Sequence, residues 1–283
     1  MNLNDGLPLI SVVIAVYNGR STLQQCIDSV NQQTYQKVEL IVMDGGSTDG
    51  TVDLLIANAQ KLTYWATEPD TGIYNAWNKA LKKAKGDWIC FLGADDYFWD
   101  VQVLALMAEK LALVSPDINV AYGQIMLLAK GDEPMYPLGQ PWEIVKARFR
   151  REMCLPHPAV MHRSGLFRRL GAFDESFRIA GDYELLLREL KDHAAIFIPD
   201  LIVTAMRQGG VSSSPNSTLT SLHEVRRAQK KAGLGWPGPN WFLALLRAYV
   251  RLILWRLAGE VLARRLLDLG RRVLGLPAYW TRT

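Results

Sequence analysis

The chain has 283 residues, of which 49% are apolar, and a formal net charge of +4. This composition supports a large folded core and excludes a wholly disordered chain or one embedded throughout in a membrane. The charge is uneven, because residues 241–283 carry eight Arg against Glu260 and Asp268, which leaves a net charge of about −2 for residues 1–240. Since the basic residues belong to the tail, a nucleic-acid-binding surface is not predicted.

The three cysteines, Cys26, Cys90 and Cys154, are far apart in the chain, without a CxxC pair or a histidine at ligand spacing. A disulfide framework and a zinc site are therefore not predicted, and a reducing compartment fits best. Residues 1–10 have neither the basic start nor the long apolar run of a secretory signal. We expect the folded body to lie in the cytoplasm.

The first hundred residues alternate between strand-like and helix-like patterns. The expected strands are short apolar runs at residues 9–16, 38–43, 62–66 and 88–92. The expected helices are amphipathic and cover residues 21–30, 49–59 and 73–84, with Ser21 and Asp49 as N-caps. This order predicts an α/β fold with a mostly parallel, Rossmann-like sheet flanked by helices, in which ligands bind at the carboxyl ends of the strands.

The alternation weakens after residue 100. We expect a proline-containing loop around residues 131–141, and the other elements are expected as helices at 101–114, 182–190 and 217–233 and strands at 120–128, 156–162 and 194–205. Residues 209–216, rich in Gly and Ser, are predicted to form a mobile loop, which either closes over a ligand or only connects its neighbours. This half of the chain is expected to complete the sheet.

The C-terminal tail, residues 241–283, is apolar but contains many Arg, and it follows a predicted linker at residues 233–240. The segment 241–257 is shorter than the roughly 20 apolar residues that a membrane span needs, and Arg residues interrupt it. On a helical wheel, residues 260–276 separate their charged and apolar side chains. That pattern predicts amphipathic helices in a membrane interface, with Arg toward anionic headgroups. Packing on the body, packing in a dimer and a true span are the alternatives.

The most informative motif is Phe91–Asp96, in which a strand-like run ends in two adjacent carboxylates, Asp95 and Asp96. We expect them at the carboxyl end of a buried strand, where parallel sheets bind ligands. Their hard oxygen atoms suit Mg²⁺ or Mn²⁺, which bind through one or two carboxylates together with substrate phosphates. The alternative is a turn that caps the next helix.

Polar segments also follow the first and second expected strands, at residues 16–20 and 43–51. The Tyr17 ring offers a stacking surface for a base, and Asp44 can accept a hydrogen bond from a base or a ribose hydroxyl. The pair Gly45 and Gly46 lets the backbone approach a ligand closely. The sequence therefore predicts a nucleotide site at this edge, with Asp49 better explained as a helix cap.

Together these motifs resemble glycosyltransferase family 2, whose members have the GT-A fold. The resemblance covers roughly residues 8–230 and leaves the basic tail outside. The matching segments, in chain order, are Ser11–Asn18, Val42–Thr51, Glu68–Lys79, Phe91–Asp96, His157, Gly171–Glu175 and Ala180–Leu185.

The resemblance implies a nucleotide-diphosphate sugar as donor, with UDP favoured, and Mn²⁺ or Mg²⁺ as cofactor, which would neutralise charge on the departing nucleotide. It implies that Asp95 ligates the metal, and we expect Asp96 and His157 to complete the metal site. Contact of His157 with the diphosphate or the acceptor, and a structural role, are the alternatives. The implied donor-binding residues are Val16, Tyr17, Asn18, Asp44, Gly46, Asp70, Asn78, Ala94 and Asp95. Two positions depart from the family pattern: Gly93 replaces the first acid of its DxD motif, and Gly45 replaces a second Asp after Asp44.

Asp182 matches the catalytic base of the family, the acid at the start of a helix. In that role it takes the proton of an acceptor hydroxyl while the oxygen attacks the anomeric carbon from the face opposite the nucleotide, so the configuration inverts. The alternative is a helix-capping carboxylate after Gly181.

The sequence therefore predicts an inverting, metal-dependent glycosyltransferase, with a GT-A domain at residues 1–232 divided into a nucleotide-binding half (1–100) and an acceptor half (101–232). The basic tail suggests a lipid-linked glycan acceptor in cell-surface polysaccharide biosynthesis, with the protein peripheral on the inner face of the cell membrane. An oxidoreductase is disfavoured because no GxGxxG follows the first strand. A catalytically silent sugar-nucleotide-binding or scaffold subunit is the alternative suggested by Gly93, and Asp182 argues against it.

Overall fold

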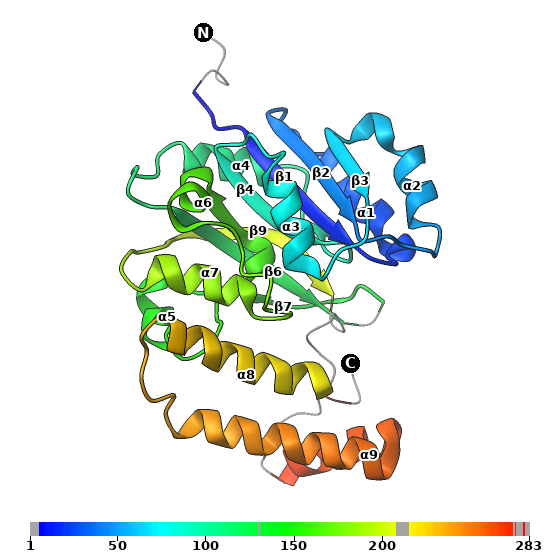
Figure 1. The fold of residues 1–283 in the computed structure, drawn as a ribbon, viewed down its shortest axis with the longest axis vertical. Coiled ribbons are helices and arrows are strands. Elements are labelled where there is room, and N and C mark those ends of the chain that lie inside the picture. Colours follow the sequence, from blue (N-terminus) through cyan, green and yellow to red (C-terminus); the bar gives the residue numbers. More distant parts are fainter. Residues whose placement is uncertain (1–5, 130, 208–214, 274, 276–279, 281–283) are drawn as a thin grey trace.

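The computed structural model describes residues 6–129, 131–207 and 215–273, together with Gly275 and Trp280. These residues form one sheet of nine strands in the order β3-β2-β1-β4-β8-β6-β9-β5, with β7 paired to β6 (Figure 1). The strands are β1 (Ile10–Val16), β2 (Val38–Asp44), β3 (Tyr64–Thr67), β4 (Trp88–Gly93), β5 (Tyr97–Phe98), β6 (Val120–Leu128), β7 (Pro134–Leu138), β8 (Val160–Arg163) and β9 (Ile196–Arg207). Strands β1 to β4 are parallel, as expected, whereas β8 runs antiparallel to both β4 and β6, so the sheet is mixed beyond β4.

Helices cover both faces of the sheet (Figure 1). They are α1 (Arg20–Asn31), α2 (Thr51–Ala57), α3 (Ile73–Leu81), α4 (Val103–Leu111), α5 (Trp142–Phe149), α6 (Ser164–Leu170), α7 (Gly181–Leu190), α8 (Pro215–Lys231) and α9 (Pro239–Val273), with 3-10 turns at Ala59–Lys61 and His157–Ala159. Strand β1 is buried on both sides, because Val12 and Ile14 belong to the core under α1 and α4 while Val13 belongs to the core under α3 and α7. This burial explains why β1 is apolar at every position except Ser11 rather than alternating.

The expected loop around residues 131–141 is wrong in part, because Pro134–Leu138 forms β7, antiparallel to β6. All five residues of β7 are exposed. Proline is tolerated there because an exposed edge strand does not need every backbone N–H for the ladder. The sequence patterns also do not predict α5 and α6, which are short and bury few side chains.

Two expected helix caps are also wrong. Helix α1 begins at Arg20 after Gly19, and α2 begins at Thr51 after Gly50, so neither Ser21 nor Asp49 occupies an N-cap position. The Asp49 carboxylate instead accepts hydrogen bonds from the N–H of Arg20 and the N–H of Thr51, both at 3.0 Å. Asp49 therefore ties the start of α1 to the start of α2.

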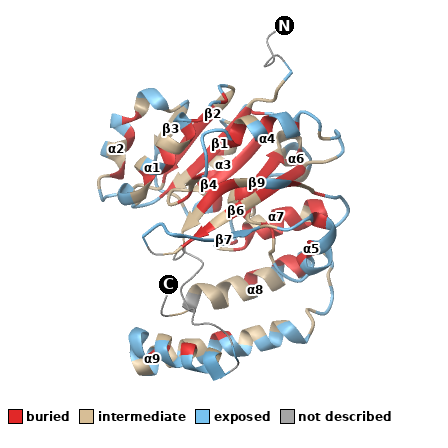
Figure 2. Cartoon of the chain, turned by 180° about the vertical axis from the view of Figure 1, so that it is seen from behind, coloured by how far each residue is buried: buried red, intermediate tan, exposed pale blue. Residues whose placement is uncertain are grey.

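The C-terminal helices α8 and α9 form a layer outside the sheet (Figure 1). Helix α9 consists of two limbs that meet at Gly259, whose φ of 71° and ψ of 168° are not helical. Trp241 donates from Nε1 to the carbonyl of Leu222 at 3.2 Å and so joins α9 to α8. Much of α9 is exposed (Figure 2), and none of the described helices is apolar over enough of its length to cross a membrane. Residues 233–238 of the expected linker lie between α8 and α9, whereas residues 239 and 240 already belong to α9. The division into domains stays a prediction.

Candidate functional site

The loops after β1 and β2 are bonded to each other at the carboxyl edge of the sheet. Asn18 has a positive φ of 51°, donates from its N–H to Ser47 Oγ at 2.7 Å, and accepts from the Thr48 N–H at 2.9 Å. Val16 is buried at the end of β1, whereas the Tyr17 ring is 67% exposed. The predicted stacking residue is therefore open to a ligand, on a loop whose backbone is fixed by the neighbouring loop.

Asp44 lies at the end of β2, where the sequence places it, and only 1% of its surface is exposed. Its Oδ2 accepts from the N–H groups of Gly46 and Ser47 at 3.1 and 3.0 Å and from Thr67 Oγ1 at 2.5 Å, and its Oδ1 accepts from Ser47 Oγ. Asp44 therefore shapes the turn that contains Gly46, whose φ is 86°. Its direct contact with a nucleoside stays a prediction.

Asp70 explains the glycine at position 45. A Cβ added to Gly45 would lie 2.5 Å from Asp70 Oδ2, well inside contact distance. The Asp70 carboxylate, held by the Gly72 N–H at 2.9 Å, thus occupies the space that a side chain at position 45 would fill. An acid is therefore present beside the Asp44 turn, although it comes from another loop.

The two carboxylates after β4 crowd over Gly93. A Cβ added to Gly93 would lie 2.7 Å from Asp95 Oδ1 and 3.0 Å from Asp96 Oδ2. Asp96 is 6% exposed and accepts from the Gly93 N–H at 3.2 Å. Burial, together with the nearby Asp95, raises the pKa of Asp96 to about 8. A nearby cation favours the charged form of a carboxylate and so opposes both of these effects. The pair of carboxylates therefore fits Mg²⁺ or Mn²⁺. Ala94 lies close to Gly19 of the nucleotide edge.

His157 lies in a buried aromatic cluster. Its ring packs against Trp77 and Phe91, and its Nε2 is 3.3 Å from Nε2 of His162. Burial lowers the pKa of His157, and nearby Asp182 acts in the opposite direction. Within the described ranges, no three His, Cys, Asp or Glu side chains come close enough to hold a metal ion by themselves. The structure thus pairs Asp95 with Asp96 and places His157 with His162.

Asp182 is the second residue of α7 and is partly buried. Its Oδ1 accepts from the Tyr183 N–H at 2.8 Å and lies 3.3 Å from the Tyr74 hydroxyl, which also donates to the carbonyl of Ile179 at 2.7 Å. Burial and the neighbouring Asp182 raise the pKa of Tyr74 well above its usual range, so its hydroxyl keeps its proton. Gly181 makes this contact possible, since a Cβ there would lie 2.7 Å from the Tyr74 ring.

Asn78, predicted near the donor, holds the loop that precedes α7. Its amide donates to the carbonyl of Phe173 at 2.9 Å and to Glu175 Oε1 at 2.8 Å, and its Oδ1 accepts from the Phe173 N–H at 3.0 Å. With only 9% exposure and these three bonds, Asn78 fixes the loop.

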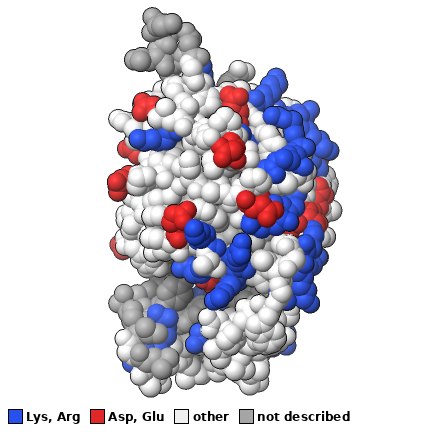
Figure 3. Space-filling model, turned by 90° about the vertical axis from the view of Figure 1, so that its left-hand side faces the viewer, with Lys and Arg blue, Asp and Glu red and all other residues white. Residues whose placement is uncertain are grey.

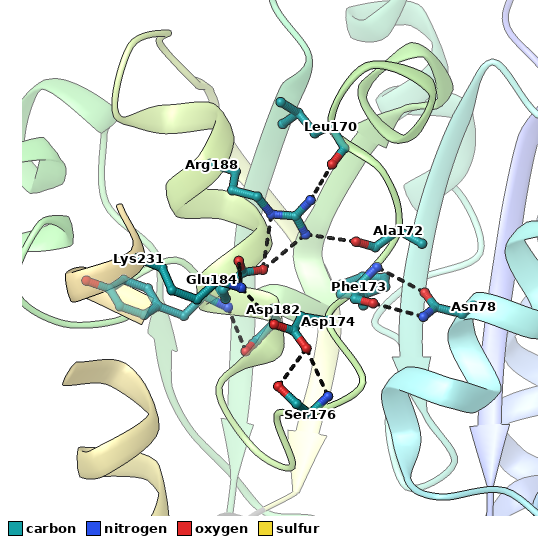
Figure 4. A network of polar contacts seen from close by, with 11 residues as sticks. Asn78, Leu170, Ala172, Phe173, Asp174, Ser176, Asp182, Glu184, Arg188 and Lys231 are labelled. Carbon is teal, nitrogen blue, oxygen red and sulfur yellow. Dashed lines mark hydrogen bonds and ion pairs between the residues drawn. The ribbon is translucent and has the colours of Figure 1, made fainter. Parts of the chain in front are cut away.

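A polar network continues from this loop to α7 and α8 (Figure 4). Arg188 bonds Glu184 as well as the carbonyls of Leu170 and Ala172, and Lys231 of α8 pairs with Asp174 at 2.7 Å and Glu184 at 2.8 Å. Although partial burial acts to raise it, hydrogen bonds from Lys231 and Ser176 hold the pKa of Asp174 below its usual range. The network fixes the segment that leads to Asp182.

Arg207, at the end of β9, is a site residue that the sequence analysis missed. Its Nη1 donates to the carbonyl of Asp95 at 2.7 Å, and its guanidinium pairs with Asp132 and lies over the Tyr97 ring. The hydrogen bond with Asp132 raises the pKa of Arg207. The available signal was its position just before the predicted Gly- and Ser-rich loop. The part of that loop at residues 209–214 lies outside the described residues.

The family comparison covers most of the sheet and its loops. A family model described as "Glycosyl transferase family 2" matches residues 11–176, which is more than half of the chain. A "PGL/p-HBAD biosynthesis glycosyltransferase" of Mycobacterium bovis is 28% identical over 233 residues, which cover 81% of this chain and 87% of that protein. An uncharacterized glycosyltransferase of Mycobacterium tuberculosis is 33% identical over 183 residues, covering 64% of this chain and 68% of that protein.

Two solved structures share the fold. S. aureus TarS 1-349 in complex with UDP-GlcNAc has a TM-score of 0.62 at 18% identity, over 77% of this chain and 66% of that chain. The mannosyltransferase PcManGT from Pyrobaculum calidifontis in complex with GDP-Man and Mn²⁺ has a TM-score of 0.63 at 19% identity, over 94% of this chain and 80% of that chain. At these identities the likeness is one of fold.

Proposed function

Because the chain belongs to glycosyltransferase family 2 and has the expected GT-A-like fold, we propose that it moves one sugar from a nucleotide-diphosphate donor to a hydroxyl of a lipid-linked glycan, with inversion at the anomeric carbon. The observation that carries this proposal is the placement of three carboxylates. Asp95 and Asp96 lie together at the carboxyl end of β4, and Asp182 lies at the start of α7, hydrogen-bonded to Tyr74. A metal-bound leaving group and a separate base both need such groups.

The donor assignment is supported by the open Tyr17 ring and by the ligands of the structural neighbours. TarS is named with UDP-GlcNAc and PcManGT with GDP-Man and Mn²⁺. UDP is the carrier we favour, and GDP is the first alternative. The lipid-linked acceptor is supported by the M. bovis relative, which is named for PGL/p-HBAD biosynthesis, and by the basic apolar tail.

In the proposed reaction, the acceptor oxygen forms a bond to the anomeric carbon while the bond from that carbon to the diphosphate oxygen breaks. The electron pair of the broken bond leaves with the nucleoside diphosphate. Asp182 takes the proton of the acceptor hydroxyl, and we assign this step to Oδ2, because the Tyr74 and Tyr183 bonds both go to Oδ1. Asp95 and Asp96 would hold Mn²⁺ or Mg²⁺, which would neutralise charge on the diphosphate when bound.

A donor screen tests the proposal. UDP-, GDP- and dTDP-sugars are offered with Mn²⁺, Mg²⁺ or EDTA, and binding and nucleotide release are measured. We expect metal-dependent binding of one donor that is lost in Asp95→Ala. We expect Asp182→Asn to bind that donor as the native protein does but to turn it over about 10²–10⁴-fold more slowly, which is the rate enhancement that a general base usually contributes. Asp192→Asn, the same change at an exposed residue in the turn that follows α7, is the control.

Two outcomes count against the enzyme. If no nucleotide sugar binds in the presence of metal, the site does not hold a donor and the proposal fails. If a donor binds but the native protein releases no nucleotide from it, the scaffold alternative suggested by Gly93 gains ground. If Asp182→Asn turns the donor over like the native protein, the enzyme stands but Asp182 is not its base.

We also propose that α9 binds the membrane surface where the acceptor lies. Its first limb exposes a continuous apolar arc, which includes Phe242, Leu243, Leu246, Tyr249, Val250, Ile253 and Leu257. At about 100° per residue, the exposed Arg247 and Arg256 fall at the two edges of this arc. Arginines beside an apolar face match anionic headgroups above acyl chains. Figure 3 shows Lys and Arg gathered on the body above a lower region with few charges.

Sedimentation with lipid vesicles tests this surface. We expect binding to vesicles that contain anionic lipid, weaker binding to neutral phosphatidylcholine, and loss of binding in Leu246→Glu with Ile253→Glu. Leu113→Glu, at an exposed apolar residue on the body, is the control. If vesicles do not bind and the protein instead forms a dimer that the double variant dissolves, a second copy covers α9 and the membrane proposal is wrong.

A further inference from the structure

One stripe of side chains on helix α8 bonds to the loop that leads to Asp182. We call Glu224, Arg227 and Lys231 the α8 stripe; their spacing of three and four residues places them on one face of the helix. Lys231 pairs with Asp174 at 2.7 Å (Figure 4), and Arg227 donates to the carbonyl of Ser176 at 2.9 Å. From Lys231 to Glu224, the contacts of the α8 stripe advance along the loop toward α7. Glu224 therefore contacts the part of the loop that is closest to Asp182.

Glu224 binds three successive backbone N–H groups directly before α7. Its Oε1 accepts from Arg178 at 2.8 Å, and its Oε2 accepts from Ile179 at 2.8 Å and from Ala180 at 2.9 Å. Glu224 is 9% exposed, so this carboxylate is removed from water and these amides are its partners. Hydrogen bonds from N–H groups to a buried carboxylate are among the stronger ones in proteins.

The bonded residues connect to Asp182 in two ways. Ala180 is the N-cap residue of α7, and its cap lacks a side-chain hydrogen bond of its own. The carbonyl of Ile179 accepts from the Tyr74 hydroxyl at 2.7 Å, and the same hydroxyl is 3.3 Å from Asp182 Oδ1. A shift of this loop therefore moves both the start of α7 and the tyrosine that holds the base.

We infer that Glu224 is a positioning residue for the proposed reaction, which fixes the Asp182 carboxylate at the angle and distance that proton removal requires. The inference rests on the proposed function of Asp182 as the base. Glu224 comes from α8, beyond the matched residues 11–176, so this support is supplied by a later part of the chain. Displacement of a reacting group by about 1 Å costs about 10²-fold in rate.

The test uses Glu224→Gln, which keeps the size of the side chain but turns an NH₂ group toward the backbone amides. Steady-state release of UDP from UDP-GlcNAc, or of GDP from GDP-mannose if that is the donor turned over, is measured in Mn²⁺. We expect kcat to fall about 10–100-fold while the Kd of the donor changes less than about twofold. Glu224→Asp, which keeps the charge, is expected to recover part of the loss.

Two controls separate positioning from general damage to the fold. Gln229→Leu removes another buried polar side chain of α8, whose amide donates to the carbonyl of Arg151 at 2.7 Å, and is expected to keep kcat within about threefold of native. In an Asp182→Asn background, Glu224→Gln is expected to have no further effect, because a positioning residue acts through the base it positions.

The outcomes distinguish the two proposals. If Asp182→Asn keeps full turnover, the proposed base fails and this inference fails with it. If Asp182→Asn loses turnover but Glu224→Gln keeps native kcat, the positioning role alone is overturned. A further loss in the double variant, or an equal loss in Gln229→Leu, shows that Glu224 only stabilises the fold.

Discussion

Gly181→Ala tests the contact between Tyr74 and the start of α7. A Cβ at position 181 would lie 2.7, 2.8 and 2.9 Å from Cε2, Cζ and Cδ2 of the Tyr74 ring, closer than carbon atoms can approach. The ring cannot easily move, because its hydroxyl donates to Ile179, one face stacks on Phe173 and an edge meets Trp77. Tyr74 is also only 3% exposed. The added methyl group must therefore displace either the ring or the first turn of α7.

The expected cost follows from this geometry. Overpacking of a filled core by one methyl group costs about 1–3 kcal/mol, and the better helix propensity of alanine offsets less than about 1 kcal/mol. We expect a net loss of about 2 kcal/mol in the free energy of unfolding, which corresponds to a fall in Tm of roughly 4–8 °C. Turnover should also fall, since the displaced turn carries Asp182.

Thermal and urea unfolding of four variants measure this cost. Gly165→Ala is the matched control, because a Cβ there meets only Arg168 Nη2 at 3.6 Å, and it should not lower Tm. In a Tyr74→Val background, which lacks the ring, Gly181→Ala should cost close to nothing. The reasoning is refuted if Gly181→Ala unfolds at the native temperature, or if it costs the same with and without the Tyr74 ring.

Two other predictions concern acid stability and the DxD-like motif. The folded-state pKa of Asp174 lies below the unfolded value of about 3.9, so the stability that Asp174 contributes is present above pH 4 and is lost as pH falls. Between pH 6 and pH 3, the free energy of unfolding measured in urea should therefore fall less for Asp174→Asn than for the native protein. The prediction is contradicted if the two proteins lose stability in parallel. Gly93→Asp installs the first acid that is usual in the family. It should weaken metal-dependent donor binding, measured by calorimetry, by about 10²-fold, because its Cβ displaces Asp95 and Asp96. Tighter binding would show that the two carboxylates move aside without cost.

The sequence by itself determined the parallel core and the position of its binding edge. Strands β1, β2 and β4 are buried on both faces, so each appears as a largely apolar run, broken only by Ser11 in β1 and Glu39 in β2, with polar residues at or after its carboxyl end. The motif that ends in Asp95 and Asp96 follows such a run, and Asp182 opens an amphipathic helix. These features depend on burial and chain direction within about ten residues, which periodicity reports directly.

Periodicity was less informative where elements are short or exposed. Strand β7 contains two prolines and is exposed throughout, so its residues resemble a loop, and only its pairing with β6 makes it a strand. The caps of α1 and α2 were misplaced because the loops after β1 and β2 bond to each other, as the contacts of Asp49 show. Local capping rules do not include a partner from another loop.

Only the tertiary structure decided which residues act together. Gly45 is explained by Asp70, the carbonyl of Asp95 is bonded by Arg207, and the loop before Asp182 is held by Glu224. Each pair joins loops or helices that are distant in sequence, and their meeting depends on how the whole chain closes around the sheet. The residues next to a side chain in sequence do not predict such a distant contact. The burial of a strand, by contrast, is predicted by the apolar residues of the strand itself.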